Sequence, residues 1–143
     1  MTEFAANSIY LQIRIQQIWI PLFNPPTPQK GKTVEEAKAD FGKAVENILD
    51  KVKLHVDKIR EKGGKVIFLC LPSTGQLREM ENTFTPRRHF WDRILKTTGA
   101  PGIHFEDFAK LKGFDCPEWS HLNRKDASEF TKRLTPILAK HLS

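Results

Sequence analysis

The chain has 143 residues, of which 39% are hydrophobic, enough for one modest core and too many for a disordered protein. Lysine and arginine outnumber aspartate and glutamate by 23 to 17, but these cations are interleaved with acids, so the net charge of +6 indicates a solvated surface and no nucleic-acid-binding face. Cys70 and Cys116 have neither metal-ligand spacing nor the pattern of a disulfide framework, so no metal or other cofactor is expected and a reducing compartment is favoured.

The N-terminus lacks the basic start and apolar core of a signal peptide, and no stretch reaches the roughly 18 apolar residues that a membrane span needs. The sequence as written therefore predicts no membrane span and a cytoplasmic location. Export of a longer parent chain stays open, because a missing front part would carry its own signal.

Residues 9–20, IYLQIRIQQIWI, form the first predicted element. Apolar and polar side chains alternate at the start of this segment, which is rich in β-branched residues, and that pattern is typical of a strand. A helix with Leu11, Ile15, Ile18 and Leu22 on one face is the open alternative.

The next segment, PLFNPPTPQKGK, contains four prolines. Proline removes a backbone donor and restricts φ, so this segment is predicted to be an extended connector. The chain is therefore expected to have two parts: the first element with its connector in 1–32, and a folded part in 33–143.

A long helix is predicted from Thr33 to about Lys62. Thr33 is a hydroxyl N-cap with Glu36 as its capping-box partner, and apolar residues follow at helical spacing as far as Ile59. A glycine pair then ends the helix.

Two strands are predicted after this helix. The segment KVIFLCLP, residues 65–72, is a continuous apolar run ending in proline, as expected of a strand buried on both faces inside a parallel sheet. The segment GIHFEDF, residues 102–108, is the candidate second strand.

Two further helices complete the predicted fold. The first begins at Pro86 and ends at Gly99, and the last is capped by Asn123, with Asp126 behind it and an expected kink at Pro136. The order of elements predicts a three-layer α/β sandwich with a small, mostly parallel, flavodoxin-like sheet, in which loops at the carboxyl ends of strands hold any site. The sheet is expected to be incomplete, with exposed edges.

The loop CPEWSHL, residues 116–122, carries the clearest candidate chemistry. Glu118 precedes His121 by three residues, so the carboxylate is able to orient the imidazole for proton transfer. A capped loop that packs one aromatic side chain is the alternative. The Glu-x-x-His spacing of di-iron sites needs a helix and a second copy, and neither is expected here. Cys116 as a thiol nucleophile beside His121 lacks an orienting group.

These features resemble the C-terminal part of GDSL/SGNH-type hydrolases over about residues 33–143. The shared features are a buried strand ending in proline, a further helix and strand, an acid-x-x-His-Leu block and a closing amphipathic helix. The resemblance implies that His121 is the catalytic base and Glu118 its orienting acid, although the family has aspartate at that position. It also implies small-molecule esters, or acylated glycans and lipids, as substrates.

The nucleophile of that family lies in a Gly-Asp-Ser or Gly-x-Ser block, which this sequence lacks. Ser73, just past the first buried strand, is the serine candidate, and its alternative is a turn-forming residue. The resemblance therefore implies an esterase or acyltransferase-related protein that is a truncated or inactive copy, or one completed by another nucleophile.

Three residues are candidates for substrate binding. Arg87 and Arg88 lie at a helix start, where the macrodipole disfavours cations, so an anionic group is expected near them, with ordinary exposed charges as the alternative. Trp119 is expected to line a sugar or acyl pocket, with core packing as its alternative.

The rival function is a non-catalytic interaction module that pairs a sheet edge with a partner chain or with itself. The partner would be a second copy, in a homo-oligomer, or a missing N-terminal half.

Overall fold

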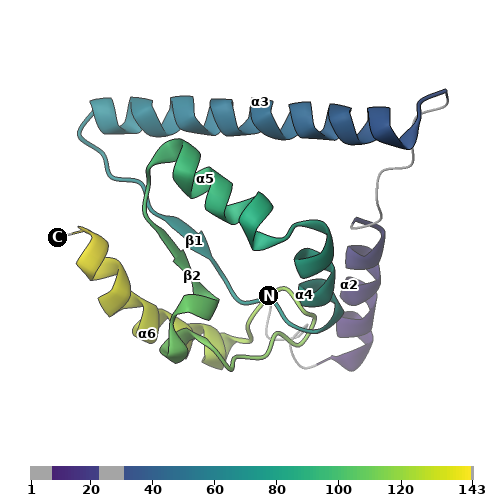
Figure 1. The fold of residues 1–143 in the computed structure, drawn as a ribbon. Coiled ribbons are helices and arrows are strands. Elements are labelled where there is room, and N and C mark those ends of the chain that lie inside the picture. The colour runs from purple at the N-terminus through teal and green to yellow at the C-terminus, as the bar shows by residue number, and fades with distance from the viewer. Residues whose placement is uncertain (1–7, 23–30, 143) are drawn as a thin grey trace.

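The computed structural model describes residues 8–22 and 31–142 (Figure 1). Short 3-10 turns lie between some of the helices and strands. In the described chain the regular elements are α2 (Ile9–Leu22), α3 (Val34–Glu61), β1 (Phe68–Cys70), α4 (Gly75–Phe84), α5 (Trp91–Thr98), β2 (Gly102–His104) and α6 (Arg124–Leu142). None of these helices combines the length and apolarity needed to cross a lipid bilayer.

The predicted three-layer α/β sandwich is wrong. The described chain is 69% helical, and its sheet has two parallel strands, with Phe68 paired to Gly102 and Cys70 to His104. The strands are short because Pro72 follows the first one, while the second runs directly into a 3-10 turn, Phe105–Asp107. Leu69 is 38% exposed, so β1 is not the doubly buried strand that the apolar run predicted.

The strand predicted over residues 9–20 is also wrong, because this segment forms α2. The helix that was the alternative is confirmed, but its predicted apolar face is buried only in part: Leu11 and Ile15 are half-buried, whereas Ile18 is exposed. The amide of Gln16 donates to the carbonyl of Pro117 at 3.2 Å, which ties α2 to the candidate site loop. Most of the proline-rich connector lies outside the described residues.

The long helix and the last helix are confirmed. Thr33 and Glu36 form a reciprocal capping box at the start of α3, and Gly63 follows its end with a φ of 78°. Asn123 accepts the backbone N–H of Asp126 at 2.9 Å at the start of α6.

The region between the strands differs from its prediction. The helix expected from Pro86 begins as a 3-10 turn, Arg87–His89, and continues as α5 until Gly99, which has a φ of 61°. Helix α4 was not predicted, because Leu77 is its one buried residue and so its apolar pattern is weak.

The hydrophobic core lies between β2, its following turns and α6. Its buried members are Ile103, Phe105, Leu111, Phe130 and Leu134. On the other face of the strands, Gly102 leaves room for α5, since a Cβ atom there would lie 2.6 Å from Leu95 and 2.7 Å from Trp91. Helix α3 packs along α5 on the far side from α6 (Figure 1).

Candidate functional site

The loop that holds Glu118 and His121 lies beside the carboxyl end of β1. The backbone N–H of Thr74 donates to the carbonyl of Trp119 at 2.9 Å, and the Thr74 hydroxyl accepts from the N–H of Cys116 at 3.2 Å. The Cys116 thiol donates to the carbonyl of Pro72 at 3.4 Å. The loop is therefore fixed to the segment after β1, the position at which sites in parallel sheets occur.

Trp119 adopts a strained backbone conformation within this loop. Its φ is 76°, the one positive value among the described non-glycine residues. Its indole lies against Gly75, where an added Cβ atom would approach the ring to 2.5 Å. This local fold turns the chain sharply between Glu118 and His121.

Glu118 and His121 are brought together as predicted from their spacing. Nδ1 of His121 lies 2.7 Å from Oε1 of Glu118. The glutamate is fully buried, whereas the side chain of His121 is 59% exposed. A buried carboxylate thus holds one edge of an imidazole that faces solvent.

Two neighbours complete the environment of the carboxylate. The hydroxyl of Ser120 donates to Oε2 of Glu118 at 2.5 Å and also lies 2.6 Å from Nδ1 of His121. The indole N–H of Trp19, from α2, points to the same Oε2 at 3.5 Å. Within the described part of the chain, the hydrogen bonds of the His121 ring are all made through Nδ1.

Neither of the two nucleophiles considered from the sequence, Ser73 and Cys116, forms a hydrogen bond with His121. Ser73 is 9% exposed, and its hydroxyl donates to Glu81 at 2.5 Å instead. Cys116 is 1% exposed, and burial, followed by the charge of Asp115, raises the pKa of its thiol to about 12. A thiol with that pKa is protonated at neutral pH and is a poor nucleophile.

The residues expected to bind substrate lie in separate places. Trp119 packs on Gly75 in the site loop. Arg87 forms a bidentate ion pair with Asp107 at 2.6 and 2.7 Å, while the exposed Arg88 donates to His89 at 2.9 Å. Their roles in binding stay predictions.

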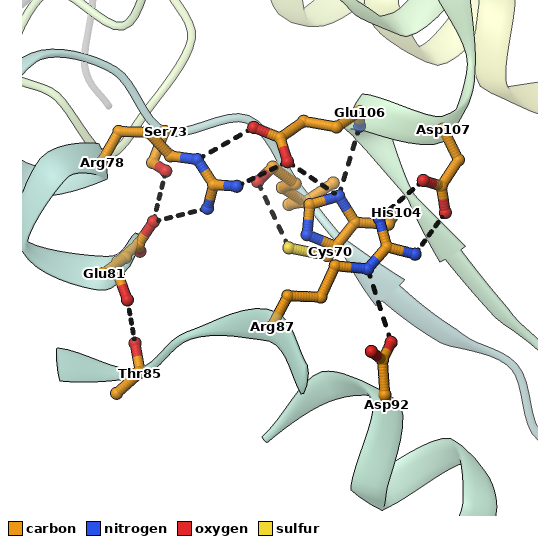
Figure 2. Close-up of polar contacts among 11 residues, drawn as sticks. Cys70, Ser73, Arg78, Glu81, Thr85, Arg87, Asp92, His104, Glu106 and Asp107 are labelled. Carbon is orange, nitrogen blue, oxygen red and sulfur yellow. Dashed lines mark hydrogen bonds and ion pairs between the residues drawn. The ribbon is translucent and has the colours of Figure 1, made fainter. Parts of the chain in front are cut away.

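A second polar cluster joins α4, the turn before α5 and the end of β2 (Figure 2). Arg78 donates from Nε to Glu106 at 3.1 Å and from Nη1 to Glu81 at 3.2 Å. Burial opposes the charge of Arg78, but the hydrogen bonds to both carboxylates outweigh it and raise the pKa of the guanidinium. The hydrogen bonds from Arg87 lower the pKa of Asp107.

His104 and Cys70 belong to the same region. The Nδ1 atom of His104 accepts the backbone N–H of Glu106 at 3.3 Å, and burial lowers the pKa of this imidazole, with a further contribution from Arg87. Burial likewise raises the pKa of the Cys70 thiol. Both side chains line a cleft of about 610 Å³ whose other wall is α3. In residues 8–22 and 31–142, no three histidine, cysteine or acidic side chains are grouped to hold a metal ion.

The sequence did not indicate Ser120, Trp19 or the bonds of Arg78 to Glu81 and Glu106. Ser120 sits between the two predicted residues, so its adjacency was the available signal. Trp19 was hidden by the wrong strand prediction, and Arg78 by the missed helix α4.

Comparison of the chain with protein-family models, curated proteins and solved structures finds no match. The resemblance to GDSL/SGNH-type hydrolases therefore stays a prediction from the sequence.

Proposed function

We propose that Glu118 and His121 form the acid–base half of an ester-cleaving site of the SGNH type. The observation that carries this proposal is the 2.7 Å contact between a fully buried carboxylate and Nδ1 of an exposed imidazole. Such a carboxylate holds the ring in one orientation, with its proton on Nδ1 and a lone pair on Nε2. That lone pair is able to take the proton of an attacking hydroxyl.

The attacking serine is proposed to come from a segment that reaches Nε2. Ser120 meets the ring at Nδ1, the wrong nitrogen for this transfer, and Ser73 is bonded to Glu81. In the first half of the reaction, the serine oxygen attacks the ester carbonyl as Nε2 takes its proton, and the imidazolium then protonates the departing alkoxide, which leaves an acyl-serine. Water or an acceptor hydroxyl then gives its proton to Nε2, attacks the acyl-serine and releases the serine, which regains its proton from the imidazolium. Hydrolysis and acyl transfer share these steps, so both outcomes fit esters and acylated glycans or lipids.

The reactivity of His121 can be measured in the isolated chain with p-nitrophenyl acetate. An imidazole lone pair attacks this activated ester directly and releases p-nitrophenolate, without a serine. We expect His121→Ala to remove most of the release by the chain. Glu118→Gln should lower it several-fold, because a neutral amide no longer favours one tautomer.

The matched control is His141→Ala, which removes an exposed histidine from the last turn of α6. This variant should release p-nitrophenolate at close to the original rate. Equal rates from the original chain and from His121→Ala would contradict the proposed role of His121.

A further inference from the structure

The apolar face of α3 is wider than the part that the rest of the chain covers. Leu49 and Val56 are 6% and 3% exposed, and they lie on the side of the helix that meets the body of the molecule. Four apolar residues on the adjoining side are 44–60% exposed: Val34, Phe41, Ile48 and Ile59. Helical geometry joins all six into one continuous apolar face, of which one half is uncovered in the described chain.

The outer edge of β1 is also without a partner strand in the described chain. The N–H of Phe68 donates to the carbonyl of Pro101 at 2.9 Å, so Phe68 faces β2. In a parallel ladder successive residues face opposite edges, which directs the N–H and C=O of Leu69 away from β2. Leu69 is 38% exposed and the following Leu71 is 56% exposed.

These two surfaces face one groove. A cleft of about 340 Å³ lies between α3 and the β1 segment, and its walls include Val52 and Ile59 from the helix and Val66 and Phe68 from the strand side. Ile48 lines both this cleft and the larger one beside His104. An extended segment at the β1 edge would therefore lie against the uncovered half of α3.

The outer rim of the groove is basic. Lys51, His55, Lys58 and Lys62 are exposed and follow one another at helical spacing beside the uncovered apolar residues. Within the described residues these three lysines have no carboxylate partner, whereas Lys53 on another face of α3 pairs with Asp57 at 2.6 Å. A second copy of the chain, related by a two-fold axis at this edge, would bring two such basic rims together, which is unfavourable.

We propose that this groove binds an extended segment of a partner polypeptide that adds a strand to the β1 edge. Its apolar side chains would face α3, and its acidic side chains would meet the lysine rim. Main-chain hydrogen bonds to Leu69 and apolar burial against α3 supply affinity, and the rim selects for negative charge. This inference does not depend on the role proposed for Glu118 and His121.

A pair of synthetic strand peptides tests the proposal. Both peptides alternate valine and threonine and carry a fluorophore, and they differ in having glutamates or lysines at their ends. Fluorescence anisotropy at low salt should show the glutamate peptide binding about tenfold or more tightly, and added salt should reduce that preference. Hydrogen exchange should show new protection of the Leu69 amide in the complex.

Substitutions locate the bound peptide. Ile59→Glu should abolish binding of the glutamate peptide, while Leu54→Glu, which changes an equally apolar residue that is 51% exposed on another face of α3, should leave it intact. The double variant Lys58→Glu with Lys62→Glu should reverse the preference toward the lysine peptide. These positions are exposed, so far-ultraviolet circular dichroism should be unchanged.

Three results of the peptide experiments would overturn the proposal. They are the absence of binding by either peptide at millimolar concentration, equal binding of the two peptides, and binding that Ile59→Glu leaves unchanged. Sedimentation that shows a dimer of the chain dissolved by Ile59→Glu would make a second copy the occupant, and would also overturn the proposed acidic partner.

Discussion

The site loop and the cluster around Arg78 are both dense in hydrogen bonds, but they differ in what faces solvent. In the cluster, each guanidinium meets carboxylates: Arg78 contacts Glu106 and Glu81, and Arg87 contacts Asp107. In the loop, a fully buried carboxylate holds a ring that is 59% exposed. The number of polar contacts therefore does not distinguish the proposed reactive site from a cluster that only stabilises the fold. The distinguishing feature is a reactive atom presented outward by a buried partner.

Removal of the buried carboxylate should have the largest effect on stability. Glu118→Ala removes the buried acceptor that Ser120 and His121 share, so we expect a loss of about 3 kcal/mol in the free energy of unfolding. Chemical denaturation followed by circular dichroism measures this loss. In Glu129→Ala, which removes an exposed carboxylate paired with Arg133, the loss should be much smaller, because solvent screens an exposed ion pair.

A loss in Glu118→Ala no larger than that in Glu129→Ala would mean that the buried carboxylate does not anchor the loop. The contrast between loop and cluster would then disappear.

Substitutions in the cluster around Arg78 should change the stability of the fold and leave the release of p-nitrophenolate unchanged. Arg78→Met keeps the length of a side chain that is 18% exposed but removes its bonds to Glu106 and Glu81, so we expect a loss of about 2 kcal/mol. Release of p-nitrophenolate should not change at a temperature at which the variant is folded. Arg133→Met, which removes the more exposed ion pair with Glu129 and a hydrogen bond to the carbonyl of Lys110, should cost less than Arg78→Met.

A fall in p-nitrophenolate release by folded Arg78→Met would show that the cluster contributes to the reaction. The cluster would then have to be counted as part of the site.

A feature of the fold was predictable from the sequence when the residues that form it lie close together in the chain. Helices α3 and α6 were predicted because their caps, Thr33 and Asn123, and their apolar periods are local features. The contact of Glu118 with His121 was predicted for the same reason, since they lie three residues apart.

The missed features depend on contacts between distant segments. The bond from Trp19 to Glu118 joins residues 99 positions apart, and the ion pair of Arg78 with Glu106 also spans separate elements. Neither has a local pattern. The predicted fold class was wrong because an apolar run indicates where a strand forms but not how many strands pair. The extent of pairing depends on neighbouring segments, and here the pairing of the two strands ends at His104.

The smallest expected effect is the pH dependence that His104 contributes. Burial, and then the charge of Arg87, lowers the pKa of His104 in the folded chain below the ordinary value of about 6.5. The unfolded chain therefore binds this proton first as pH falls, so stability is lost on acidification from the ordinary pKa toward the lower, folded value. Between about pH 7.5 and pH 5.5 the original chain should lose more stability than His104→Gln. Urea denaturation of both proteins at the two pH values isolates this difference, because the two proteins differ only at residue 104. Parallel losses would show that His104 carries no such penalty.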